Sequence, residues 1–285
     1  MSIFPLISTD QLVDLLEHPG DFRLVDCRFD LANPGWGREN FLQAHIPGAI
    51  YADLNQDLSS APSKNTGRHP LPDPEKFVDT LANWGIEPGR LVVAYDTTGA
   101  SFADRFWWLL NAIGHENVQL LDGGFPKWQA EGHPIHSGLE PVASTSFHYR
   151  PVFNPEMYLT TLQILEIVND PAWLLIDARS TERFQGLVEP IDPVAGHIPG
   201  AVNRIQSANL TSTGTFKPIE RLRQEYAALI GSRPLDHVVV YCGSGVSSCH
   251  HLAALQAMGL SGVRLYVGSW SEWIRDPSRP IATGE

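Results

Sequence analysis

Short apolar runs alternate with amphipathic segments along the whole chain, and this alternation occurs twice. Apolar runs of strand length occupy residues 23–27 and 91–95 in the first half and residues 173–177 and 237–242 in the second. Segments with helical spacing occupy residues 74–84, 102–113, 219–230 and 246–258. Strands separated by helices predict an α/β fold in which each half is a parallel sheet flanked by helices.

Repeated motifs accompany this repeated pattern. The tetrapeptide VDCR at 25–28 is echoed by IDAR at 176–179, and AHIPGAI at 44–50 is echoed by GHIPGAV at 196–202. GGFPKW at 123–128 likewise corresponds to GSWSEW at 268–273. A repeat this long indicates two copies of a globular domain, which a chain of 285 residues can accommodate.

The irregular segments suggest where the copies divide. Residues 136–154 contain Pro, Ser, Thr and Gly without periodicity, which is typical of a linker. We therefore predict a first domain over 1–138, a linker over 139–154 and a second domain over 155–285. Residues 33–40 and 55–74 read as long loops, and loops of such length in a domain are often functional.

Composition narrows the functional classes. A net charge of −12 argues against nucleic acid or an anionic membrane as partner. No apolar stretch is long enough for a membrane span, and the N-terminus lacks the pattern of a secretory signal. Three cysteines, at 27, 242 and 249, fit neither a disulfide framework nor a metal-binding pattern. We expect a cytoplasmic protein without a metal or other cofactor.

The two copies differ where a catalytic group could stand. The strand at 91–95 leads into Asp96, whereas the corresponding strand leads into Cys242 and then a small-residue turn, Gly-Ser-Gly-Val-Ser-Ser. Such a turn can direct successive N–H groups inward as an anion nest, and the following helix adds its positive end. A thiol there should have a lowered pKa and be a nucleophile near neutral pH.

Simpler roles fit several other residues. A buried structural cysteine is the alternative for Cys242, and it is the favoured interpretation for Cys27 and Cys249. His45 and His197 occur in both copies, including the one without the cysteine, so a structural role is favoured over catalysis. The same reasoning applies to Arg28 and Arg179.

The cysteine turn, the duplicated HIPGA motif and the GSWSEW segment together resemble the rhodanese-type sulfurtransferases. The resemblance implies tandem rhodanese domains, an inactive first domain, and an active site at the interface between them. It also implies that the cysteine carries a persulfide cradled by the turn residues Gly243, Gly245, Val246, Ser247 and Ser248. Asp96 fits the inactive copy, since a carboxylate cannot carry a sulfane sulfur.

A cysteine phosphatase is the obvious rival. Its Cys-x5-Arg loop needs an arginine to bind phosphate, but the positions that could hold it are Ser248 and Cys249. The sequence therefore argues against a phosphatase.

The uncharged Gly243-Ser244 pair resembles the 3-mercaptopyruvate subtype, whereas animal thiosulfate sulfurtransferases have a basic loop after the cysteine. The resemblance implies a relay of Ser244 with His69 and Asp53, for which loop capping and solvation are the simpler alternatives. It implies that Arg183 binds the donor carboxylate. A second arginine is expected in a Glu-Pro-Arg motif, but the chain has Ile191 there, and Arg68 is a candidate substitute.

The resulting hypothesis is a sulfurtransferase that moves a sulfane sulfur from a small anionic donor, with 3-mercaptopyruvate favoured, through a Cys242 persulfide. The acceptor would be a thiol, cyanide or a thioredoxin-like protein. A thiosulfate:cyanide sulfurtransferase and a non-catalytic persulfide carrier module are the alternatives.

Overall fold

The computed structural model describes residues 4–18, 22–97, 99, 101–147 and 149–284. Its backbone contacts divide the chain into two units. The first includes the described residues up to Ser60 together with Pro72–Asn154 and Leu210–Phe216. The second includes Ala61–Leu71, Pro155–Asn209 and the described residues from Lys217 onward. The segment Ala61–Leu71 thus belongs to the second unit, although in sequence it lies between two stretches of the first.

The first unit is built on a parallel sheet, five-stranded in its described residues, with the order β1-β5-β4-β2-β3. Its strands are β1 (Leu6–Ile7), β2 (Phe22–Asp26), β3 (Ala49–Tyr51), β4 (Leu91–Tyr95) and β5 (Val118–Leu121). Its helices are α1 (Thr9–Leu16), α2 (Trp36–Gln43), α3 (Pro74–Asn83), α4 (Ser101–Ala112) and α5 (Gly124–Ala130). Leu12 of α1, Phe41 of α2 and Trp128 of α5 share one core cluster with the sheet.

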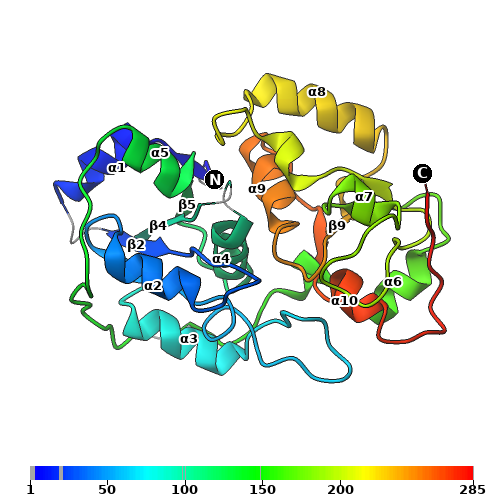
Figure 1. Cartoon of the computed structure of the whole chain (residues 1–285), viewed down its shortest axis with the longest axis horizontal. Helices are drawn as coiled ribbons and strands as arrows, with labels where there is room; N and C mark the ends of the chain where they lie inside the picture. The colour runs from blue at the N-terminus through cyan, green and yellow to red at the C-terminus, as the bar shows by residue number, and fades with distance from the viewer. Residues whose placement is uncertain (1–3, 19–21, 98, 100, 148, 285) are drawn as a thin grey trace. The chain divides into compact units, whose positions relative to one another are not determined.

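The second unit repeats this topology, since its described strands form a parallel sheet in the order β6-β10-β9-β7-β8. Its strands are β6 (Tyr158–Leu159), β7 (Leu174–Asp177), β8 (Val202–Asn203), β9 (Val238–Tyr241) and β10 (Arg264–Tyr266). Its α-helices are α6 (Thr161–Ile167), α7 (Thr181–Phe184), α8 (Ile219–Ile230), α9 (Cys249–Ala257) and α10 (Ser269–Trp273). Three 3-10 helices complete the described elements: η1 (Pro155–Met157), η2 (Gln206–Asn209) and η3 (Leu235–His237). In Figure 1, α10 lies beside α6, and α9 lies beside β9.

The helix starts follow from local sequence in the same way in both units. Ser8 caps α1 and Thr160 caps α6, each through a reciprocal capping box with a glutamine three residues later. Asp73 caps α3, whose first residue is a proline. The described helices are all too short or too polar to span a bilayer.

The repeated motifs contact one another in each unit. The Arg28 guanidinium pairs with Asp26 at 2.6 Å and lies 4.1 Å from the centre of the Phe125 ring. Arg179 pairs with Asp177 at 2.6 Å and lies 4.7 Å from the centre of the Trp270 ring. Because both copies contain this arrangement, it belongs to the fold rather than to catalysis.

The two repeated histidines are buried in the same way. His45 stacks on the Phe41 ring at 4.2 Å and its Nδ1 lies 2.7 Å from the Phe41 carbonyl. His197 stacks on Phe184 at 3.7 Å and its Nδ1 lies 2.7 Å from the Phe184 carbonyl. These contacts give both histidines the structural role expected from their repetition.

Two sequence predictions of secondary structure were wrong in part. Residues 33–40 were expected to be a loop, but α2 begins at Trp36, because burial of Phe41 in the core outweighs the loop-like composition. The helix expected over 246–258 begins only at Cys249, since the preceding residues form the turn after Cys242. The remaining predicted helices and strands begin and end within a residue or two of their observed bounds.

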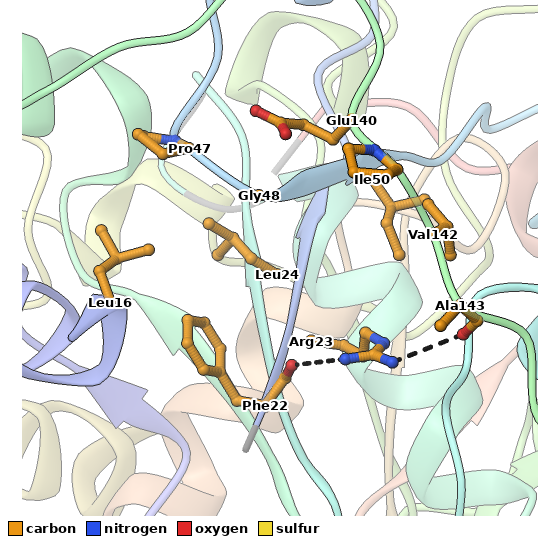
Figure 2. A pocket seen from close by; sticks show the side chains of 11 residues that line it. Leu16, Phe22, Arg23, Leu24, Pro47, Gly48, Ile50, Glu140, Val142 and Ala143 are labelled. Atoms are coloured by element: carbon orange, nitrogen blue, oxygen red, sulfur yellow. Dashed lines mark hydrogen bonds between the residues drawn. The ribbon is translucent and has the colours of Figure 1, made fainter. Parts of the chain in front are cut away.

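Each unit also holds a cavity at one edge of its sheet. The first cavity, about 400 Å³, is drawn in Figure 2, where the Arg23 guanidinium donates to the carbonyls of Phe22 and Ala143. The second, about 390 Å³, lies against the corresponding Pro199-Gly200 turn of the other copy. Neither lining includes a cysteine or serine, so we do not assign catalysis to these cavities.

Candidate active site

Cys242 follows directly after β9 and is buried, with 2% of its surface exposed. The GSWSEW segment holds the backbone here: the Cys242 N–H donates to Ser269 Oγ at 3.2 Å, and the Cys242 carbonyl accepts from the Trp270 N–H at 3.0 Å. The Gly243 carbonyl accepts from the Ser271 N–H at 2.9 Å. The motif repeated at 268–273 therefore fixes the start of the cysteine turn.

The turn itself curls back to the sulfur before α9 begins. Gly245 has a φ of +75°, and a Cβ placed on it would lie 2.6 Å from the Val267 carbonyl oxygen, so only glycine fits. Val246 is buried, and its carbonyl accepts from the Cys249 N–H at 3.1 Å. Ser248 donates from Oγ to Cys242 Sγ at 3.5 Å. The turn thus brings the Ser248 hydroxyl back to the sulfur of Cys242.

These contacts lower the pKa of Cys242. Burial is the largest single influence and opposes ionisation, but the Ser247 and Ser248 hydroxyls and the Ser244 and Ser248 N–H groups together outweigh it. Cys27 shows the opposite behaviour, since burial first and the Asp26 carboxylate next raise its pKa well above the ordinary value. The two thiols differ because hydroxyl and N–H donors stabilise the charged form of Cys242, whereas carboxylates near Cys27 oppose its ionisation.

The corresponding position of the first unit holds Asp96, which is fully buried after β4. Its Oδ2 accepts from the N–H groups of Phe102 at 2.7 Å and Ala103 at 3.0 Å, at the start of α4. The anion site of the fold is thus filled there by a side-chain carboxylate.

His69 and Ser244 lie together, with His69 Nδ1 2.7 Å from Ser244 Oγ, and both are buried. The segment Ala61–Leu71 that carries His69 is tied to the region around α10. The Gly67 N–H donates to Glu272 at 3.2 Å, and the Arg68 N–H donates to Ser271 Oγ at 3.0 Å. The predicted long loop therefore brings a histidine to the cysteine turn of the second unit.

Asp53, the third expected member of the relay, belongs to the first unit. Its carboxylate accepts from the N–H groups of Asn55 at 2.8 Å and Gln56 at 3.0 Å, and its own N–H donates to Asp57 at 2.8 Å. These bonds cap a local turn, and a role for Asp53 in the relay stays a prediction.

Two arginines approach the turn beside Gly243. A Cβ placed on Gly243 would lie 2.7 Å from Arg68 Nη2 and 3.6 Å from Arg183 Nη2. Arg183, on α7, donates from Nε to Glu189 at 3.0 Å and from Nη2 to Asp192 at 3.1 Å. The turn carries no charge of its own, but two guanidinium groups lie next to it.

Sequence reasoning missed the acidic partners of these arginines. Asp192 pairs with both Arg68 and Arg183, and Glu189 pairs with Arg183 and Arg179. The irregular stretch around them has no periodicity that would indicate which side chains point inward. Ile191, which replaces the expected second arginine, is 44% exposed.

In the described part of the chain, His, Cys, Asp and Glu side chains do not gather in a group of three or more that could hold a metal ion. The side chains of the site can supply a thiolate nucleophile, proton transfer through Ser244 and His69, and anion binding by arginine.

The lowered pKa leads to a direct prediction. Because the thiolate is the reactive form, the rate of Cys242 alkylation by iodoacetamide should reach half its maximum at a lower pH than for a free cysteine. Ser248→Ala removes one donor to the sulfur, so that midpoint should rise and the rate at pH 7 should fall by about threefold to tenfold. Mass mapping of the Cys242 peptide measures both, and a midpoint equal to that of free cysteine in the unmodified protein would contradict the geometry.

Comparison with known proteins agrees with this architecture. The rhodanese-like domain model matches residues 8–131 and again residues 160–276. A probable 3-mercaptopyruvate sulfurtransferase of Pseudomonas aeruginosa is 46% identical over 287 residues, covering 100% of both chains. A putative thiosulfate sulfurtransferase of Mycobacterium tuberculosis is 38% identical, covering 98% of this chain and 97% of the relative.

A solved structure gives the same result. The 3-mercaptopyruvate sulfurtransferase from Leishmania major superposes with a TM-score of 0.84 at 29% identity, covering 94% of this chain and 74% of that one. The sequence-based predictions of tandem rhodanese-like α/β domains and of a sulfurtransferase are confirmed. The chain belongs to the rhodanese family.

Proposed function

We propose that this sulfurtransferase takes sulfur from 3-mercaptopyruvate and holds it as a persulfide on Cys242. The observation that carries the proposal is a thiol of lowered pKa in a turn that has hydroxyl donors on its sulfur and guanidinium groups beside it. Two names support the same donor: the relative at 46% identity is named a probable 3-mercaptopyruvate sulfurtransferase, and a relative from Rattus norvegicus at 36% identity is named 3-mercaptopyruvate sulfurtransferase.

In the first step, the Cys242 thiolate attacks the thiol sulfur of the donor and forms an S–S bond. The carbon–sulfur bond breaks, and its electron pair leaves as the enolate of pyruvate, which takes up a proton. The transferred sulfur stays on Cys242 as a persulfide, and the carbon skeleton is reduced to pyruvate. Gly243, Gly245, Val246, Ser247 and Ser248 would stabilise the charge on the outer sulfur through the turn.

Ser244 and His69 would supply the proton-transfer path for this step. Their 2.7 Å contact lets the imidazole orient the hydroxyl toward the ketone or the enolate. Asp53 is the proposed third member, which would fix the imidazole orientation.

Arg183 would bind the donor carboxylate. A guanidinium can donate two parallel hydrogen bonds to a carboxylate, and Arg183 lies next to the residue that follows the nucleophile.

A second nucleophile then completes the cycle. A small thiol, cyanide or a thioredoxin-like protein would attack the outer sulfur, break the S–S bond and return Cys242 as the thiolate. We propose that this takes place in the cytoplasm, since all three cysteines are free and buried, as a reducing compartment permits.

Thiosulfate is the second candidate donor. The name of the relative at 38% identity, a putative thiosulfate sulfurtransferase, favours it. With thiosulfate the same attack on the outer sulfur would release sulfite.

Comparing kcat/KM for the two donors tests the choice. We expect 3-mercaptopyruvate to be preferred by at least about tenfold, because only this donor has a ketone for Ser244 to act on. Ser244→Ala should lower kcat with 3-mercaptopyruvate by about a hundredfold and kcat with thiosulfate far less.

The matched control is Ser232→Ala, an exposed serine after α8, which should leave both values unchanged. A preference for thiosulfate would overturn the assigned donor, and an equal loss with both donors in Ser244→Ala would overturn the role of Ser244 at the ketone. Both results would leave sulfur transfer by Cys242 intact.

A further inference from the structure

We propose that Asp192 determines donor specificity: it joins Arg68 and Arg183 into one carboxylate-binding pair and keeps that pair unsuited to a dianion. The inference rests on the proposed function, because it concerns the anion that reaches Cys242. It also assigns to Arg68 the carboxylate-binding role of the second arginine, which was expected at the position of Ile191.

The geometry shows how Asp192 holds the pair. Its side chain is only 3% exposed, and its two oxygens bind different arginines, Oδ1 that of Arg68 and Oδ2 that of Arg183 at 3.1 Å. Arg183 arrives from α7, whereas Arg68 arrives from the segment tied to Ser271 and Glu272. One carboxylate therefore unites two guanidinium groups from distant parts of the sequence.

The two guanidinium groups lie next to the turn that begins at the nucleophile, Cys242. Both guanidinium groups lie beside the position that a Cβ of Gly243, the residue after Cys242, would take. Because glycine has no side chain, Arg68 Nη2 can come this close to the turn. Gly243 thus allows Arg68 to supply a cation that the turn lacks.

Arg68 also has unused hydrogen-bonding capacity. Its Nε is buried and has no hydrogen-bond partner in the described part of the chain. A buried donor without an acceptor is costly, and an oxygen of an incoming anion would satisfy it.

The charges near the pair cancel. The arginines Arg68, Arg183 and Arg179 are matched by the carboxylates Asp192, Glu189 and Asp177. A planar carboxylate with one charge can still use the directed N–H donors, but a dianion such as thiosulfate finds no net positive charge among these six side chains to offset its desolvation. Asp192→Asn keeps the shape and leaves one unmatched positive charge.

The test measures kcat/KM for both donors in the unmodified protein, Asp192→Asn and Arg68→Gln. Asp192→Asn should shift the ratio of kcat/KM by about tenfold toward thiosulfate. Arg68→Gln should raise KM for 3-mercaptopyruvate by about tenfold with little change in kcat. Asp236→Asn, an exposed aspartate of η3, is the matched control and should leave the ratio unchanged.

A second readout does not depend on turnover. Pyruvate and sulfate, a monoanion and a dianion, are titrated for their protection of Cys242 against alkylation. In the unmodified protein pyruvate should protect at the lower concentration, and Asp192→Asn should shift the balance toward sulfate. Arg68→Gln should weaken protection by pyruvate, which tests the pair even if Asp192→Asn does not fold.

The outcomes separate the two proposals. Absence of sulfur transfer from either donor, together with the predicted shift in protection, would refute the proposed function but support the anion pair. An unchanged donor ratio and unchanged protection in folded Asp192→Asn, or protection by pyruvate that survives Arg68→Gln, would overturn the inference about the pair.

Discussion

Replacing Cys242 with serine should abolish sulfur transfer, with kcat falling by more than about a thousandfold. The hydroxyl cannot hold a sulfane sulfur, and in the described residues the other two thiols lack an environment that makes a nucleophile. Cys27 has a pKa raised by burial, and Cys249 is buried with its Sγ donating to the Gly245 carbonyl at 3.4 Å. The measurement is steady-state turnover with 3-mercaptopyruvate and with thiosulfate.

Cys249→Ser is the matched control, because it changes the same atom seven residues later and keeps a donor to Gly245. It should retain activity within about threefold, since a conservative buried change leaves the turn in place. A Cys249→Ser variant as inactive as Cys242→Ser would show that sulfur passes between two cysteines, which the account does not include.

Replacing Gly245 with alanine should disable the turn. Alanine at a φ of +75° costs about 1–2 kcal/mol, and its Cβ would lie 2.6 Å from the Val267 carbonyl oxygen, so the backbone must move. Because the Ser247 and Ser248 hydroxyls reach the sulfur from this turn, we expect at least about a hundredfold loss of kcat/KM and a lower Tm.

Gly259→Ala separates strain from geometry. Gly259 follows α9 with a φ of +77°, but a Cβ there meets no atom within 4 Å. Gly259→Ala should therefore carry a similar free-energy cost for the positive φ, but it should show a smaller fall in Tm and an unchanged kcat/KM. Equal losses of activity in both variants would mean that general destabilisation, rather than the shape of the turn, accounts for the effect.

Much of the fold was predictable because the pattern of strands and helices is visible in the local sequence of both copies. The apolar runs that form β4 and β9 are short and continuous, which is typical of buried central strands of a parallel sheet. The repeated VDCR and IDAR motifs contain the same buried ion pair in both units. Helix α2 was missed because Pro34, Gly35 and Gly37 suggest a loop. The helix forms because Phe41 packs into the core, and that tertiary contact is not visible in the local sequence.

The site was predictable where function follows from neighbours in sequence or from the resemblance to a known family. The turn after Cys242 could be read from six consecutive residues, and the Ser244–His69 pair followed from the resemblance to the rhodanese family. Asp192 could not be found in this way, because it meets Arg68 across 124 positions of sequence. Whether Asp53 joins the pair, and the domain bounds at 138 and 155, stay predictions.

The most direct test of the account is the mass of the intact protein after a single exposure to 3-mercaptopyruvate without acceptor. We expect the gain of one sulfur atom, mapped to the peptide that contains Cys242, reversed by cyanide and absent in Cys242→Ser. An equal gain in Cys242→Ser, or a sulfur mapped to Cys27 or Cys249, would contradict it.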